Sequence, residues 1–162
     1  MPDDDVQVAA DEIRRNFDRC TEAILKGDPD GFVASFGPAG RGETAEGVAI
    51  TIAESYDYIA WRMGRTIAAH SFVVGFDSVE GSADEVTIEF TEDSSATVLD
   101  ANSKPVVRAA HSVNRALWRR EDGEWNQIGG VELENVRTVD GVGISPEEDP
   151  VGVHAYRARN SA

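Results

Sequence analysis

The spacing of apolar residues changes once along this chain, after Gly64, and that change constrains the fold more than any other feature. Before Gly64, apolar side chains recur every three or four residues, as they do along one face of a helix. After it, apolar and polar residues alternate, as they do along a strand with one buried face. The alternating stretches are residues 65–76, 85–98, 106–121 and 125–136. The pattern predicts one α+β domain, with helices first and antiparallel strands after them.

Three helices are expected before Gly64. The first ends near Gly27, and the dipeptide Asp28-Pro29, which combines a capping residue with a proline suited to the first helical turn, starts a short second helix. The loop at residues 37–42 is rich in glycine and is expected to be a simple connector. Thr44 is the expected cap of a third helix that continues to about Met63. The apolar faces of the first and third helices carry Ile13, Phe17, Cys20 and Ile24, and Val48, Ile52, Tyr56, Ile59 and Met63.

The sharpest local signal is Asp122-Gly123 between the last two strands, because glycine adopts the positive φ that a tight hairpin needs. An uninterrupted ladder leading away from this turn pairs Val113 with Glu132. Two faces then follow: one with His111, Arg115, Glu132 and Glu134, the other with Ser112, Asn114, Trp118, Trp125 and Gln127. Both faces mix polar and apolar residues, so either one could line a pocket.

A formal net charge of −15 disfavours nucleic acids and anionic membranes as partners, because their phosphates carry charge of the same sign. No apolar run approaches the roughly 18–20 residues of a membrane helix. The acidic first residues do not resemble a secretory signal, so a cytoplasmic location is expected. The single cysteine, Cys20, cannot form an internal disulfide and is expected to be a buried, inert thiol.

Three segments are expected along the chain. Residues 1–8 are interpreted as a disordered acidic lead, residues 9–136 as the folded domain, and residues 137–162 as an irregular tail rich in Gly, Pro and acidic residues.

The order of these elements resembles the nuclear-transport-factor-2-like superfamily, in particular its SnoaL-like and ketosteroid-isomerase-like branch. The most specific match is the hairpin Trp-Arg-Arg-Glu-Asp-Gly-Glu-Trp at residues 118–125, and the helix junction Gly-Asp-Pro-Asp-Gly-Phe at residues 27–32 supports it. The resemblance covers about residues 9–136. It implies a curved antiparallel sheet wrapped on three helices as a cone (a cystatin-like roll), an apolar pocket at the open end, and homodimers that pack through the sheet.

One departure from that family limits what the resemblance implies. Members of the family carry a short hairpin between the second and third helices, and in the isomerases it bears the catalytic aspartate. Residues 37–43 contain no strand-like run and no aspartate, so no family mechanism is carried over.

Tyr56, His70 and His111 are the candidate catalytic residues, because a tyrosine or histidine in an apolar cone could carry a proton. Each has a structural alternative: a core tyrosine bonded to the backbone, a core histidine, and a surface histidine paired with a carboxylate. The expected ligand-binding residues are Phe17, Trp61, Asn114, Trp118 and Glu132. No short motif supports a metal site, and no cofactor is expected.

These residues and the resemblance predict a small-molecule-binding domain that performs acid–base chemistry on an apolar, oxygenated metabolite. Isomerisation, cyclisation, dehydration and hydrolysis all remain open. The alternative is a non-catalytic ligand-binding or dimerisation domain. A cavity on which two or more polar groups converge would favour the enzyme.

Overall fold

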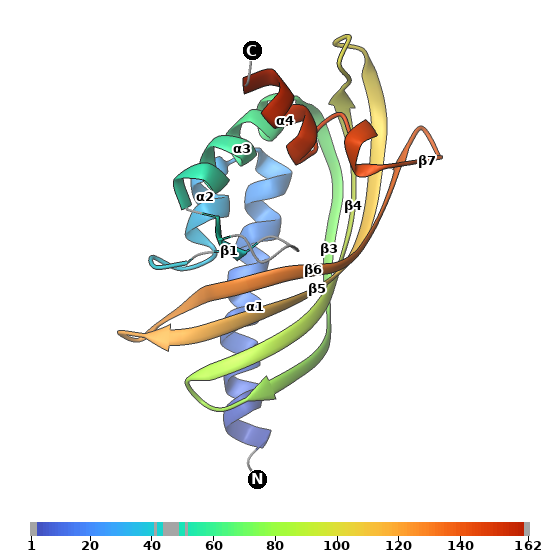
Figure 1. The fold of residues 1–162 in the computed structure, drawn as a ribbon. Coiled ribbons are helices and arrows are strands. Elements are labelled where there is room, and N and C mark those ends of the chain that lie inside the picture. Colours follow the sequence, from blue (N-terminus) through green and yellow to red (C-terminus); the bar gives the residue numbers. More distant parts are fainter. Residues whose placement is uncertain (1–2, 41, 44–48, 51, 161–162) are drawn as a thin grey trace.

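A computed structural model describes residues 3–40, 42–43, 49–50 and 52–160, and it confirms the predicted α+β cone (Figure 1). The sheet contains five antiparallel strands in the order β3-β4-β5-β6-β7 and curves around the long helix α1. Helices α2, α3 and α4 gather on the same concave side. The elements are α1 (Asp3–Lys26), α2 (Pro29–Ala34), β1 (Gly42–Glu43), β2 (Ala49–Ile50), α3 (Ile52–Gly64), β3 (Thr66–Gly81), β4 (Glu85–Leu99), β5 (Pro105–Glu121), β6 (Glu124–Val139), β7 (Val142–Ile144), a 3-10 turn η1 (Pro146–Glu148) and α4 (Val153–Asn160).

The main core lies between α1 and the concave side of β3, β4 and β5. Ala9, Ile13 and Phe17 of α1 pack there against buried side chains of the sheet, including Val74, Val86, Ile88, Phe90, Ala116 and Trp118. Burial of a large apolar side chain contributes about 1.5–3 kcal/mol, so this contact holds helix and sheet together. None of the described helices is long and apolar enough to span a membrane.

Helix α1 begins at Asp3, where a disordered lead was expected over residues 1–8. The core explains part of the difference. Ala9 is already fully buried against the sheet, so the helix has to be formed at this residue, and the preceding turns extend the same helix. The acidic residues at the start suit this position, since carboxylates near a helix N-terminus are favoured by the helix dipole.

Residues 42–43 and 49–50 also differ from expectation. Gly42–Glu43 pairs with Ala49–Ile50 as a short antiparallel ladder where a connector and the start of a helix were expected. Helix α3 therefore begins at Ile52, and the expected cap, Thr44, lies outside the described residues. The loop before this ladder needs its glycine: Gly37 has φ +91°, and a Cβ there would lie 2.3 Å from the backbone oxygen of Trp125.

Strands β5 and β6 pair through the predicted hairpin, but the ladder contains two β-bulges. Trp118 pairs with Gln127 and Leu117 with Gly129, so Ile128 is the extra residue of the first bulge. A second bulge follows between the pairs Asn114–Glu132 and Val113–Glu134. The predicted pairing of Val113 with Glu132 is therefore wrong, because each bulge adds one residue to β6 alone. Between the bulges the residues of β6 face the opposite side from the one expected, and Glu132 turns from the convex face to the concave face.

The tail at residues 137–162 was expected to be irregular, but its described part, residues 137–160, contains strands and a helix. Strand β6 runs to Val139, and a second Asp-Gly turn, at Asp140 (φ 50°) and Gly141 (φ 82°), leads into β7. Helix α4 then packs on α3, where Tyr156 lies against Tyr58 and Trp61 with ring centroids 5.6 and 5.5 Å apart. Figure 1 shows this end of the chain folded back over the helices.

Candidate functional site

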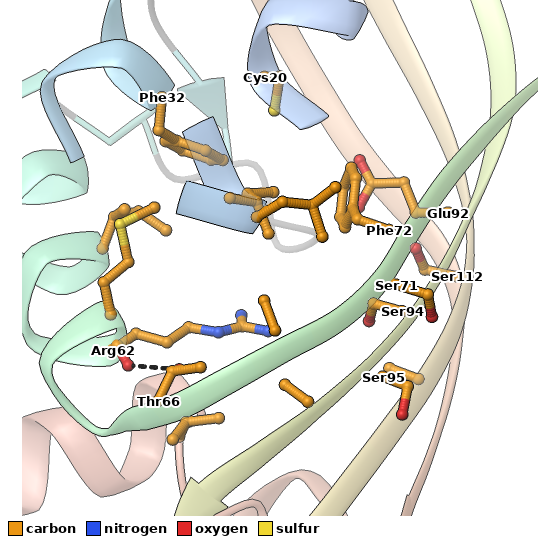
Figure 2. A pocket seen from close by; sticks show the side chains of 18 of the residues that line it. Cys20, Phe32, Arg62, Thr66, Ser71, Phe72, Glu92, Ser94, Ser95 and Ser112 are labelled. Atoms are coloured by element: carbon orange, nitrogen blue, oxygen red, sulfur yellow. Dashed lines mark hydrogen bonds between the residues drawn. The ribbon is translucent and has the colours of Figure 1, made fainter. Parts of the chain in front are cut away.

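The concave side of the sheet and helices α1, α2 and α3 enclose a cavity of about 520 Å³ (Figure 2). Small-molecule sites in proteins have volumes of about 300–1,000 Å³, so the cavity has room for a metabolite. The sequence did not determine which face of β5 lines a pocket, and in the structure it is the face that carries Ser112 and Asn114.

Aromatic rings form the apolar wall of the cavity. Phe17 of α1 packs edge-on against Phe90 of β4, with centroids 4.8 Å apart, and Phe32 packs edge-on against Phe36 at 5.0 Å. Phe72 of β3 completes the wall. Such pairs contribute about 0.5–1.5 kcal/mol beyond their buried area, so the wall is formed without a ligand.

Glu92 projects into this apolar environment from the middle of β4 (Figure 2). Its side chain is half-buried, because the cavity reaches it while the rest of its surroundings are protein. Burial raises the pKa of Glu92 from 4.5 to about 7; Arg62 opposes this shift and Glu132 adds to it. A carboxyl group with this pKa exists in both protonation states at neutral pH, so it can give or accept a proton there.

Arg62, in the last turn of α3, points its guanidinium group into the cavity (Figure 2). Burial acts to lower the pKa of Arg62, but the neighbouring Tyr58, Asp149 and Glu92 together raise it above its usual value. Arg62 is therefore a permanent cation inside the cavity, and it can hold an anion or a developing oxyanion.

Glu132 reaches the edge of the cavity because of the first β-bulge. Its side chain is 43% exposed and lies 3.7 Å from Arg137. Asn114 of β5 lies directly opposite Glu132 in the ladder, and its amide Nδ2 donates to Oγ of Ser112 at 2.9 Å. Ser112 lies opposite Glu92 of β4 in the neighbouring ladder. Polar groups from β4, β5 and β6 thus converge on the wall of the cavity.

A buried ion-pair cluster closes the cavity next to α4. Arg108 of β5 donates from Nε and from a terminal nitrogen to the two carboxylate oxygens of Asp149, at 2.8 and 2.7 Å. Arg137 lies 3.1 Å from the same carboxylate. Burial opposes ionisation of Asp149, but the hydrogen bonds and charge of Arg108 hold its pKa below 3.8. The hydroxyl of Tyr58 donates to the backbone oxygen of Val151 at 2.8 Å, and Val151 lines the cavity.

The three predicted catalytic residues do not line the cavity. His70 and His111 are exposed on the convex face, where His70 Nε2 lies 2.7 Å from Thr97 Oγ1 and His111 Nδ1 lies 2.6 Å from Asp93 Oδ1. Tyr56 is half-buried on α3 and is not among the described residues that line the cavity.

The predicted ligand-binding residues divide into two groups. Phe17, Asn114 and Glu132 line the cavity. Trp118 is buried in the core, with its ring 5.7 Å from that of Phe17, and Trp61 packs between Tyr58 and Tyr156.

Glu92 and Arg62 were missed at the sequence level, and for Glu92 a signal was present. Val86, Ile88 and Phe90 precede it and Ala96 and Val98 follow it at the same alternating spacing, so this face of β4 is apolar on both sides of one carboxylate. An acidic residue within a buried alternating pattern is a sign of function. Arg62 offered no comparable signal, because arginine is common in the last turn of a surface helix.

Among the described residues, no three histidine, cysteine or carboxylate side chains are grouped closely enough to hold a metal ion. Cys20 also faces the cavity, but burial raises the pKa of its thiol to about 12, so it stays protonated and unreactive.

Comparisons by sequence return no match, either to protein-family models or to curated proteins. Solved structures with the same fold were found at 11–17% identity, which shows the fold alone. A candidate scytalone dehydratase from Novosphingobium aromaticivorans superposes with a TM-score of 0.65 at 13% identity, covering 82% of this chain and 89% of its own. A hexachlorocyclohexane dehydrochlorinase, LinA type 2, gives 0.64 at 13% identity, with 89% and 97% covered. An NTF2-like protein from Cytophaga hutchinsonii gives 0.55 at 14% identity, with 76% and 95% covered. The fold of the chain is the nuclear-transport-factor-2-like cone that its helix and strand order resembled.

Proposed function

We propose that this domain binds a small apolar, oxygenated molecule in the cavity and acts on it by acid–base chemistry, with Glu92 as the proton carrier. The observation that supports the proposal best is the position of Glu92: a carboxyl group with a pKa of about 7, inside a cavity lined by phenylalanine rings. A general acid or base works best when its pKa lies near the working pH.

Arg62 supplies the second part of the proposed mechanism. Removal of a proton next to a carbonyl, or departure of a hydroxyl group, places negative charge on an oxygen atom. A fixed guanidinium group in a site sheltered from water stabilises that charge. Ser112 and Asn114, on the wall between the two carboxylates, are suited to orient a hydroxyl or carbonyl group of the ligand.

Two of the similar structures have names that describe eliminations, a dehydratase and a dehydrochlorinase. Eliminations need a base to remove a proton from carbon and a group that assists the leaving atom. Glu92 can serve as the base, and Arg62 can stabilise the charge that develops. Dehydration is therefore the reaction we place first, and isomerisation through the same proton transfer second.

A panel of cyclic β-hydroxyketones tests this proposal, because their dehydration gives conjugated enones that absorb in the ultraviolet. With a substrate from the panel, Glu92→Gln is expected to lower turnover by a factor on the order of 10²–10⁴. The matched control is Glu89→Gln, a carboxylate on the convex face of the same strand, paired with Arg115. Control variants Tyr56→Phe, His70→Gln and His111→Gln are expected to keep most of the activity.

Equal activity of Glu92→Gln and the parent protein would contradict the role of Glu92. Loss of activity in Tyr56→Phe, His70→Gln or His111→Gln would indicate that the substituted residue is the proton carrier. Tight binding without turnover of any ligand would support the non-catalytic alternative.

We also propose that two copies of the domain pack through the convex face of the sheet. Several large apolar side chains are exposed there or at its edges, including Val73 at 60%, Val136 at 55% and Val107 at 46%. Light scattering at micromolar concentration is expected to give about twice the monomer mass of 17.5 kDa. Val136→Asp is expected to shift the mass to that of the monomer, and a monomeric parent protein would contradict the proposal.

A further inference from the structure

The cavity has two chemically different sides. Phe32, Phe36 and Phe72 form an apolar side, and Figure 2 shows Arg62 and Thr66 across the open space from Phe32. A ligand that fits both sides must itself have two chemically different ends.

Most of the charged side chains that line the cavity are paired with a partner outside it. Lys26 pairs with Glu22, and Arg108 pairs with Asp149. Glu132 lies 3.7 Å from Arg137. These pairs leave little charge on the lining to attract a ligand.

Arg62 is different. It interacts with the neutral hydroxyl group of Tyr58 and with the charge of Asp149, but both oxygens of Asp149 already accept from Arg108, and Arg137 lies beside them. Among the described residues, its remaining counter-charge is Glu92, which is only partly ionised at neutral pH. A guanidinium group away from bulk water with an incomplete counter-charge favours the approach of an anion.

We infer that the cavity selects ligands that carry one anionic group, a carboxylate or a sulfonate, on an apolar body, and that Arg62 binds the anion. The inference rests on the proposed small-molecule function of the same cavity and narrows its ligand class. Arg62 forms charge-assisted hydrogen bonds to the anion while the phenylalanine side holds the ligand body. Selectivity over a neutral ligand of the same shape is expected to be on the order of 10- to 100-fold.

Binding of the anion is coupled to the protonation of Glu92. An anion beside Arg62 competes with ionised Glu92 for the same guanidinium group and disfavours its negative charge. Among the described residues, the other ionisable groups that face Glu92 are Glu132 of β6 and Cys20 of α1, whose thiol stays protonated. Affinity for an anionic ligand is therefore expected to fall as the pH rises through about 7, whereas affinity for a neutral ligand changes less.

Two fluorescent probes with the same aromatic body test this inference: 8-anilinonaphthalene-1-sulfonate, which is anionic, and N-phenyl-1-naphthylamine, which lacks the sulfonate. The parent protein is expected to bind the anionic probe at least about 10-fold more tightly at pH 6. In Arg62→Met this preference should disappear, with affinity for the neutral probe changed by less than about 3-fold. Arg119→Met, which removes an arginine paired with Glu85 on the convex face, is the matched control and should keep the preference.

Two further variants sharpen the result. Glu92→Gln should keep the preference for the anionic probe and lose its dependence on pH. Arg62→Lys retains the positive charge and much of the packing, so it gives the test a second variant if Arg62→Met does not fold. It should show a reduced but measurable preference.

The outcomes separate this inference from the proposed function. Equal affinities for the two probes, or a preference that survives in Arg62→Met, would overturn the inference and leave small-molecule binding in place. Failure of both probes to bind would contradict the binding function itself, and the inference with it.

Discussion

The acidic residues on the two faces of the β4–β5 ladder differ in the partners that lie opposite them. On the convex face each acid of β4 lies opposite a basic partner on β5: Glu85 with Arg119, Glu89 with Arg115, and Asp93 with His111, at 2.9, 2.8 and 2.6 Å. On the concave face Glu92 lies opposite Ser112, a residue that cannot neutralise it. Glu92 and Asp93 are consecutive in the sequence, so one step along the strand separates a surface carboxylate with a basic partner across the ladder from a cavity carboxylate that lies opposite a serine.

The comparison shows how differently the two faces stabilise a carboxylate. The convex pairs are exposed to water, and pairs of this kind contribute about 0–1 kcal/mol each. Glu92 lacks such a partner and has little solvent, so its charged form is disfavoured and its proton is held near neutral pH. The alternation that places a ladder of ion pairs on the convex face places the carboxyl group with the raised pKa on the concave face, in the cavity.

The largest expected effect concerns the buried ion pair at the concave side. Asp149→Asn leaves Arg108 and Arg137 next to each other without the buried carboxylate that lies between them, and breaking a buried pair costs about 3–5 kcal/mol. Chemical denaturation at pH 7 should show this loss in the free energy of unfolding. The loss should shrink as the pH falls through the lowered pKa of Asp149, because the parent protein then also loses the negative charge.

Asp93→Asn is the matched control on the convex face, where the carboxylate is 58% exposed beside His111. Its unfolding free energy should lie within about 1 kcal/mol of the parent value. Similar losses for the two variants would remove the distinction between the faces.

An intermediate effect is expected for Glu92→Gln, and its sign depends on pH. The folded-state pKa of about 7 is higher than the ordinary value of 4.5, so the folded protein binds more protons than the unfolded chain between these values. The contribution of Glu92 to stability is therefore most favourable at low pH and is lost as the pH rises to about 7. Glutamine does not titrate, so the variant should gain up to about 3 kcal/mol relative to the parent between pH 5 and pH 8. A difference that stays constant over this range, measured by denaturant titration, would contradict the raised pKa.

The smallest effect is expected for His111→Gln. The imidazole is 47% exposed and its partner is a surface carboxylate, so stability should change by less than about 1 kcal/mol between pH 5 and pH 8. Thermal melts at the two pH values measure this directly. A larger loss in protein at micromolar concentration would indicate that a second copy covers the convex face around His111.

The features that were predicted correctly from the sequence depend on local rules. The alternation of apolar residues located β3 to β6, and Asp122-Gly123 located the hairpin, because both signals are contained in a few neighbouring residues. Of the predicted site residues, Phe17, Asn114 and Glu132 line the cavity and the others do not, because the residues of a cavity come together only through the tertiary structure. Arg62 faces the cavity only because α3 packs at the end of the cone, and His111 lies outside it because the opposite face of β5 turns inward. Glu92 interrupts the apolar pattern of β4 and could have been selected from it, but Tyr56 and the two histidines were chosen as the candidate proton carriers.

The bulge at Ile128 determines which side chains of β6 face the concave side of the sheet by the number of residues it inserts, and not by their identities. A regular ladder would pair Asn114 with Val131 and send Glu132 to the convex face, with the sequence unchanged. The strand register therefore affects the cavity independently of the residue types. A mutation that removed the bulge would place Val131, instead of Glu132, opposite Asn114, although neither residue had been replaced. Chains that share this fold at so little identity must be aligned with their β-bulges matched before their pocket residues are compared. One unmatched bulge assigns every later residue of the strand to the wrong face of the sheet.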